Sequence, residues 1–288
     1  MAGLPADPVE EILRAHRING PWAPLPATGI ANRIYATADV VLRIATDHPD
    51  GVLDARTESV AAPVARAAGI KTPELIVFDD SRVLIDRPYS IWERVHGETL
   101  GLVAPDARDV LGTWAQVGRE LAKLHLTIRE CPDPHGWLDA PEYGDPRNYL
   151  AALDQPIRGR VGRWLERLSP ALDVAVTPRF LHGDLHDMNV MCSRSGNLLA
   201  LIDWGDAGWG DPAIEFTDVP LAALPTVVEA YESIAPGLLG AGAEARILWY
   251  RLARGMKRLA TGSASADRVA EHLAFREKAP PRWKAVWG

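Results

Sequence analysis

The sequence has only two cysteines, Cys131 and Cys192, so no framework of disulfides can hold the fold together. It also lacks any run close to the roughly 18–20 apolar residues that a membrane-spanning helix needs. Residues 1–20 show no basic segment followed by an apolar one, which is the pattern of a secretory signal. These absences predict a cytoplasmic protein that has a hydrophobic core and no membrane partner.

The chain also has fewer basic than acidic residues. The chain has 31 basic and 38 acidic residues, a net charge of -7, which argues against nucleic acid as the main partner. This balance is compatible with a cationic small substrate and, equally, with a surface that simply keeps the protein soluble. With 288 residues, of which 47% are hydrophobic, the chain is long enough for two small domains or one large one.

Strand patterns are concentrated in the first third of the chain and helical patterns in the rest. The first part predicts helices over 8–16 and 54–68 and strands over 30–36, 40–45, 75–78, 82–86 and 90–95. The second part predicts long helices over 107–128 and 148–168, short strands over 174–181, 190–192 and 198–202, and helices from 213 to a tail rich in Pro and Trp at 280–288. The chain therefore divides near His96.

The strongest functional motif lies near the centre, where His182-Gly183-Asp184 is followed by Asn189 and then by Asp203-Trp204-Gly205. This spacing matches a phosphoryl-transfer centre of the protein-kinase kind. Asp184 follows an apolar strand and can orient a substrate hydroxyl by accepting its hydrogen bond. Asn189 and Asp203 supply an amide oxygen and a carboxylate, which are ligands that Mg²⁺ prefers.

The same segment also resembles a zinc or iron hydrolase site, because His182, Asp184 and His186 alternate along the chain. That interpretation is weaker, since the chain has only eight histidines and no second cluster of His and Asp lies near in sequence. It would also leave Asp203 without a role. We interpret His186 as a packing or supporting residue.

Elements that bind phosphate are less clear in the sequence. Gly29 and Asn32 lie in a turn of small residues whose backbone N–H groups could approach phosphates, but the chain contains neither G-x-G-x-x-G nor G-x-x-x-x-G-K-[ST]. Arg43 lies in a predicted strand, where its cation could neutralise phosphate oxygens, and Glu58 on the next helix is its natural partner. Both could instead be ordinary surface charges.

Four acidic residues follow the proposed metal ligand closely and could line a cleft that accepts amines: Asp206, Asp211, Glu215 and Asp218. Asp211 precedes Pro212, so its first interpretation is a helix cap with Pro at the first helical position.

Together these segments resemble the aminoglycoside phosphotransferase family, which has a protein-kinase-like fold. The resemblance rests on 180–190, 201–206 and 210–213, with weaker matches at 32–35, 41–43, 93–100 and 118–125. It implies an α+β fold of two lobes: a small one over 1–95, with an antiparallel sheet and one helix, and a larger, mostly helical one over 96–288.

By the same resemblance Asp184 would be the catalytic residue, and Asn189 and Asp203 would bind Mg²⁺. Arg43 would contact the nucleotide phosphates, and backbone groups of Glu93 and Val95 would hold the adenine. The chain departs from the family pattern in two places. It has Arg43 where the family has Lys, and it has 214–216 where the family often has an Asp-Leu pair.

The implied activity is transfer of the γ-phosphate of ATP or GTP to a hydroxyl of a small molecule. The leading acceptor is an antibiotic, an aminoglycoside or another cationic compound such as a tuberactinomycin-type peptide. A metabolic kinase acting on a sugar, choline-like or amino-alcohol substrate is the first alternative, and a non-catalytic nucleotide-binding scaffold is the second. The sequence leaves monomer and homodimer open.

Overall fold

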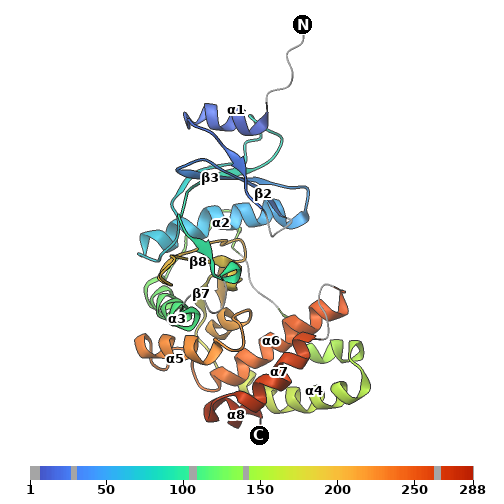
Figure 1. The fold of residues 1–288 in the computed structure, drawn as a ribbon. Helices are drawn as coiled ribbons and strands as arrows, with labels where there is room; N and C mark the ends of the chain where they lie inside the picture. The colour runs from blue at the N-terminus through green and yellow to red at the C-terminus, as the bar shows by residue number, and fades with distance from the viewer. Residues whose placement is uncertain (1–6, 27–30, 104–108, 139–142, 263–266, 288) are drawn as a thin grey trace.

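The computed structural model describes residues 7–26, 31–103, 109–138, 143–262 and 267–287. The chain forms a smaller, sheet-containing N-terminal lobe above a larger, mostly helical lobe (Figure 1). Gly29, which we predicted to lie near phosphate, is outside the described residues. In the parts of the chain that the structure describes, no helix is both long enough and apolar enough to span a membrane.

An antiparallel five-stranded sheet forms the N-terminal lobe, in the order β1-β2-β3-β5-β4. The strands are β1 (Ala23–Pro24), β2 (Asn32–Ala36), β3 (Val40–Ala45), β4 (Leu75–Asp79) and β5 (Tyr89–Glu93). Side chains alternate along β3, so Leu42 and Ile44 pack with α1 (Pro8–Ala15) while Arg43 points to the opposite face.

Helix α2 (Pro49–Ala67) lies under this sheet and brings Glu58 toward Arg43 (Figure 1). It begins five residues earlier than predicted because His48 caps it and Pro49 starts it, and it continues through Pro63. The strand predicted over 82–86 was wrong. Those residues form a series of bends, in which Arg82 has a φ of 60°, a left-handed conformation that a strand does not allow.

The larger lobe is built on the buried pair α3 (Val110–Thr127) and α5 (Leu224–Ile234). Four further helices surround it: α4 (Gln155–Leu168), α6 (Ala243–Ala260), α7 (Asp267–Lys278) and α8 (Pro281–Trp287). Short 3₁₀ segments connect these elements: η1 (Leu100–Leu102), η2 (Pro146–Ala152), η3 (Ser169–Asp173), η4 (Asp187–Asn189) and η5 (Pro212–Phe216). The segment predicted as a tail is largely α8, whose Trp283 is buried against Phe275.

Two small sheets position the central motif. One pairs β7 (Arg179–Leu181) with β10 (Gly208–Gly210), and the other has the order β6 (Glu98–Thr99), β8 (Val190–Cys192), β9 (Leu198–Leu201). The strand predicted over 174–181 shortens to β7, since Pro178 cannot donate to a ladder. The loops after β7 and β9 carry Asp184 and Asp203, so the two sheets place both carboxylates near the junction of the lobes.

Candidate active site

The loop after β7 is held by a buried carboxylate. Glu215, 1% exposed, accepts hydrogen bonds from the backbone N–H groups of His182 (2.9 Å) and Gly183 (3.0 Å). His125 lies 3.3 Å from the same carboxylate. Gly183 has a φ of 88°, and a Cβ there would come within 1.9 Å of the Asp206 carbonyl oxygen, so only glycine fits. Glu215 therefore fixes the loop and is not exposed to a substrate, which corrects our prediction for it.

Asp184 lies between two basic side chains. Its Oδ1 is 2.5 Å from an Arg254 guanidinium nitrogen, and its Oδ2 is 3.3 Å from His186 Nε2. Burial works against the charge of Asp184, but His186 and Arg254 outweigh it and hold the pKa of this carboxyl well below its usual range. The hydrogen bonds to Asp184 and Asp187 raise the pKa of His186 to about 9. Asp184 is thus ionised and His186 protonated at neutral pH.

Asn189 lies beside Asp184, as predicted from their spacing, and Asp203 directly follows a residue that is hydrogen-bonded to Asn189. Asn189 donates from its amide nitrogen to the Asp184 carbonyl oxygen (2.8 Å), and the Ile202 N–H donates to the Asn189 carbonyl (3.0 Å). The second bond ties Asn189 to the residue before Asp203. Asp203 has a φ of 67°, unusual for a residue with a side chain, and its carboxylate is 44% exposed.

These oxygens fit a magnesium ion better than they fit zinc or iron. The amide nitrogen of Asn189 is occupied, which leaves its oxygen available, and Asp203 supplies an exposed carboxylate. Nowhere in the described ranges do three or more His, Cys, Asp and Glu side chains form a group suited to a metal. His182, a ligand of the hydrolase alternative, binds the Ile202 carbonyl oxygen at 3.0 Å instead.

Arg43 and Glu58 form the ion pair that the sequence predicted. One Arg43 nitrogen lies 2.6 and 2.7 Å from the two Glu58 oxygens, and another donates to Asp203 Oδ1 at 2.9 Å. Burial works against the guanidinium, but Asp203 and Glu58 raise its pKa. Burial also raises the pKa of Glu58 above its usual range, against the influence of Arg43. Whether Arg43 contacts a nucleotide stays a prediction.

Asp54 is a neighbour of this site that sequence reasoning missed. It lies one helical turn before Glu58, and its Cβ is 2.7 Å from the position a Cβ would take at Gly205. Burial, followed by the charges of Asp206 and Asp203, raises the pKa of Asp54 to about 7. The same face of α2 thus presents Glu58 and Asp54 to the Asp203 segment. The spacing of four residues between Asp54 and Glu58 was the feature of the sequence that could have indicated that both face this site.

The remaining predicted nucleotide residues lie on the N-terminal side of the site. Asn32 begins β2, opposite Ala45. Glu93 ends β5, where its side chain pairs with Arg66 at 3.1 Å and its backbone N–H donates to the Glu74 carbonyl oxygen at 2.9 Å, so that N–H is not available to adenine. Val95 follows in the connection to the larger lobe, and no described backbone carbonyl accepts a hydrogen bond from its N–H. Their role in holding adenine stays a prediction.

Only one of the four acidic residues predicted to bind amines lines the pocket next to this site. Asp211 caps η5 through Ala213 N–H (2.9 Å) and binds Arg246 at 2.7 Å, which confirms the helix cap that was our first interpretation of it. Asp206 is exposed, and its backbone carbonyl lies against Gly183. Its charge acts on Asp54. Asp218 alone faces the pocket described next.

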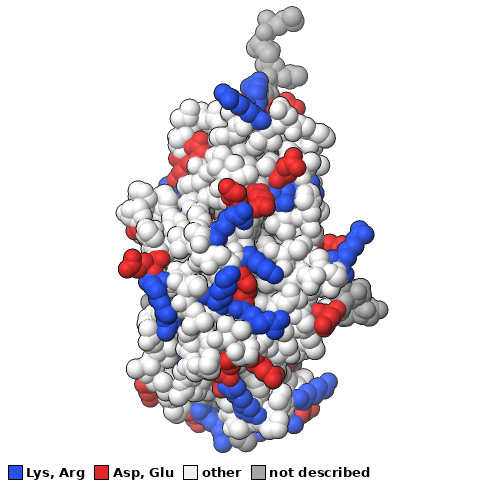
Figure 2. Space-filling model, turned by 90° about the vertical axis from the view of Figure 1, so that its left-hand side faces the viewer, with Lys and Arg blue, Asp and Glu red and all other residues white. Residues whose placement is uncertain are grey.

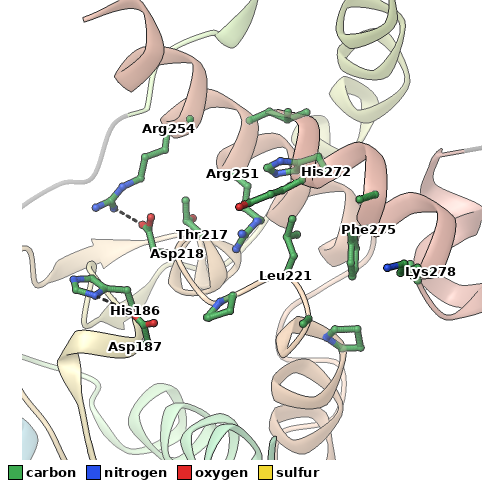
Figure 3. A pocket seen from close by; sticks show the side chains of 18 of the residues that line it. His186, Asp187, Thr217, Asp218, Leu221, Arg251, Arg254, His272, Phe275 and Lys278 are labelled. Carbon is green, nitrogen blue, oxygen red and sulfur yellow. Dashed lines mark ion pairs between the residues drawn. The ribbon is translucent and has the colours of Figure 1, made fainter. Parts of the chain in front are cut away.

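A pocket of about 950 Å³ opens beside the loop that follows β7, between η5, α6 and α7 (Figure 3). Arg254 reaches it from α6 and binds Asp218 at 2.9 Å as well as Asp184, although 70 residues separate Arg254 from Asp184 in sequence. Its neighbour Tyr143 accepts a hydrogen bond from it at 3.2 Å. Sequence reasoning missed Arg254, because a lone arginine on an amphipathic helix carries no motif.

The surface gives no sign of a nucleic-acid interface on the face that Figure 2 shows. Lys and Arg side chains are interspersed there with Asp and Glu, and no extended patch of one sign stands out. This is consistent with the acidic net charge of the whole chain.

Comparison with known proteins places the chain in a family. Residues 24–246 match the model of the phosphotransferase enzyme family, APH, so this protein belongs to the phosphotransferase enzyme family. Among curated proteins it is 26% identical over 163 residues to the uncharacterized protein YcbJ of Bacillus subtilis (strain 168), a match that covers 51% of this chain and 49% of that protein. The chain thus spans about half the length of this curated relative.

Solved structures share the fold over nearly the whole chain. A choline/ethanolamine kinase family protein from Mesorhizobium loti superposes with a TM-score of 0.64 at 20% identity, covering 93% of this chain and 91% of that one. The ternary complex of streptomycin, ATP and APH(2")-IIa superposes with a TM-score of 0.60 at 17% identity, covering 95% and 97%. At these identities the likeness shows the fold, which confirms the predicted protein-kinase-like α+β architecture of two lobes. The division at residues 95 and 96 stays a prediction.

Proposed function

We propose that this protein transfers the γ-phosphate of ATP or GTP to a hydroxyl of a small molecule. The observation that carries the proposal is the convergence of Asp184, Asn189 and Asp203 next to a pocket large enough for such a molecule. Membership of a phosphotransferase family supports the chemistry. Nucleotide use is further supported by the ATP present in one of the structural neighbours.

Asp184, His186 and Arg254 have different roles in the proposed reaction. Asp184 accepts a hydrogen bond from the acceptor hydroxyl and aligns its oxygen with the γ-phosphorus. The oxygen bonds to phosphorus as the bond from phosphorus to the bridging oxygen breaks, ADP or GDP departs with that electron pair, and the hydroxyl proton passes to solvent. Asp184 acts here by positioning, since its low pKa makes it a weak base. Protonated His186 and Arg254 add positive charge beside the transferred group.

Mg²⁺ fits the oxygens of Asn189 and Asp203 and would neutralise the charge of the nucleotide phosphates when bound. Arg43, held by Glu58, lies against the same Asp203 carboxylate and would add a second cation for the phosphates. The contacts of one Arg43 nitrogen with both Glu58 oxygens keep the guanidinium in place before any nucleotide arrives.

Two acceptor classes follow from the relatives. An aminoglycoside acceptor, and with it a role in antibiotic resistance, is suggested by the streptomycin complex. A metabolic acceptor is suggested by the choline/ethanolamine kinase family protein. The acidic residues that would have favoured a cationic antibiotic are mostly engaged inside the protein, so the structure offers the antibiotic no added support. We also propose a cytoplasmic location, where ATP and magnesium are abundant.

The test is acceptor-dependent release of ADP or GDP across a panel of aminoglycosides, cyclic peptides, sugars and amino alcohols. Release that requires Mg²⁺ and disappears in Asp184→Asn would support the proposal. Nucleotide binding without turnover of any compound would favour the scaffold alternative.

A further inference from the structure

Trp137 follows a helix of the larger lobe but contacts the smaller lobe. It lies in the irregular segment 129–138 that leaves α3. The guanidinium carbon of Arg56, on α2, lies 5.5 Å from the centroid of the Trp137 ring, and Phe78 of β4 packs edge to face against that ring at 6.1 Å. The Thr57 hydroxyl, also on α2, donates a hydrogen bond to the Trp137 carbonyl oxygen at 2.5 Å. Both the side chain and the backbone of Trp137 are therefore attached to α2.

The turn that carries Trp137 is itself closed by hydrogen bonds. The Asp133 carboxylate accepts bonds from the backbone N–H groups of Trp137 (2.8 Å) and Leu138 (2.9 Å). The His135 ring stacks on the Trp137 ring with their centroids 4.5 Å apart. These contacts fix the indole within its own segment, so a contact with α2 restrains the helix relative to the larger lobe.

The other attachment of α2 lies just beyond its C-terminal end. The Lys71 carbonyl oxygen accepts a hydrogen bond from the N–H of Leu201 at 2.8 Å. The Thr72 hydroxyl accepts one from the Trp204 indole at 3.0 Å. Between these bonds and the middle of the helix, the residues of α2 that are buried in the core of the larger lobe are alanines, whose small side chains form no deep ridges: Ala61, Ala62 and Ala65.

A helix attached at one end can swing about that end. Glu58 lies nine residues before Ala67, the last residue of α2, which is about 14 Å along the axis. A swing of about 10° would therefore displace Glu58 by about 2 Å, enough to break its contacts with Arg43. Trp137 contacts α2 at Arg56 and Thr57, the two residues before Glu58, which is where a second attachment restrains this swing best.

The ion pair between Arg43 and Glu58 does not hold α2 strongly by itself. The two side chains are only 13% and 4% exposed. Taking both charges out of water costs free energy that offsets most of their attraction. The pair is therefore favourable only when other contacts have already brought its two partners together.

We propose that Trp137 is a positioning residue: it fixes α2 so that Glu58 holds Arg43 on the nucleotide side of the site. The inference rests on the proposed function, in which Arg43 adds a cation for the nucleotide phosphates. Trp137 does not touch the nucleotide in this account. It acts through α2, which lies between the sheet and the larger lobe (Figure 1).

The experiment measures the affinity for MgATP by calorimetry in single variants. Trp137→Ala should bind MgATP about tenfold more weakly than the wild type, because Arg43 is no longer oriented. Trp137→Phe keeps an aromatic ring against α2 and should recover most of the affinity. Trp283→Ala is the control, because it removes the same buried ring from α8, at the opposite end of the molecule from α2 (Figure 1). It should lower Tm and leave the affinity for MgATP unchanged.

A double-mutant cycle distinguishes positioning from a general loosening of the fold. If Trp137 acts through Glu58, Trp137→Ala should cost about tenfold in MgATP affinity in the wild type but less than about twofold in Glu58→Gln, where Arg43 has already lost its charged partner. Should Trp137→Ala not fold, Thr57→Val takes its place in the cycle. It removes only the hydrogen bond to the Trp137 carbonyl oxygen and should weaken MgATP binding about threefold.

The inference is overturned if the variant in the cycle binds MgATP as tightly as the wild type, or if its loss of affinity is equally large in Glu58→Gln. It is also overturned if Trp137→Phe recovers nothing, or if Trp283→Ala weakens binding to the same extent. Binding that is lost in Asp203→Asn but unchanged in Trp137→Ala would overturn the inference alone. A wild type that binds no MgATP would refute the proposed function, and the inference with it.

Discussion

Replacement of Glu215 should destabilise the protein through the catalytic loop. In Glu215→Ala the buried N–H groups of His182 and Gly183 both lose their acceptor, and His125 loses its partner. An unsatisfied buried donor costs about 1–3 kcal/mol, so two of them cost about 2–6 kcal/mol together. For a chain of this size that corresponds to a fall of roughly 4–24 °C in Tm. Glu215→Gln keeps one acceptor oxygen and should cost about half as much.

The assay is thermal unfolding followed by circular dichroism, with Glu229→Gln as the control. Glu229 is exposed on α5, so the same chemical change there should alter stability by less than about 0.5 kcal/mol. A Tm for Glu215→Ala within about 2 °C of the wild type would refute the reasoning. It would mean that the carboxylate does not hold the loop.

The same carboxylate predicts a dependence of stability on pH. Burial opposes its charge, but His125, His182 and the loop N–H groups outweigh burial and lower its pKa. A carboxyl whose folded pKa is lowered stabilises the fold above the ordinary glutamate value of about 4.3, and this contribution is lost as pH falls through the folded value. The loss of Tm as the pH falls below about 4.3 should therefore be smaller in Glu215→Gln than in the wild type. An equal loss would contradict this.

Three further predictions concern the site itself. Asp184→Asn should lower kcat by about 10²–10⁴-fold while calorimetry finds MgATP binding preserved, and a kcat near that of the wild type would exclude Asp184 as the residue that orients the acceptor. Because the pKa of His186 is raised to about 9, its ion pair with Asp184 is fully present below the ordinary histidine value of about 6.5 and is lost as pH rises through about 9. Activity should therefore fall above pH 9, and the pH profile of His186→Gln should lack this limb; a limb that persists would point to another group. Arg43→Lys should weaken MgATP binding about tenfold, because lysine has one nitrogen where Arg43 uses two to hold Glu58 and Asp203 in a fixed plane, and unchanged affinity in calorimetry would remove Arg43 from the nucleotide site.

The residues that the sequence predicted well are those that lie close together along the chain. Asp184 and Asn189 are separated by one short loop, and Asp203 follows a hydrophobic strand whose end marks its place. Spacing was therefore enough to predict that Asn189 lies beside Asp184 and that the strand ending before Asp203 lies next to Asn189. The pair of Arg43 and Glu58 was predictable for a similar reason, since a strand followed directly by a helix leaves few arrangements.

The acceptor side could not be predicted in this way. The 3.6-residue period of α6 shows which face is apolar, but it does not show that Arg254 meets Asp184 and Asp218 across the pocket. The prediction that the four acidic residues after Asp203 line one amine-binding cleft was wrong for a related reason. Proximity in sequence does not decide whether a carboxylate faces solvent or accepts hydrogen bonds inside the fold, as Glu215 does.

Calorimetric titration of ATP into the protein, with Mg²⁺ and with EDTA, tests most directly whether Asn189 and Asp203 form the metal-nucleotide side of a phosphotransferase site. The account predicts binding that depends on Mg²⁺ and weakens at least about tenfold in Asp203→Asn, where the metal loses a charged ligand. ATP binding that is indifferent both to Mg²⁺ and to Asp203→Asn would contradict it.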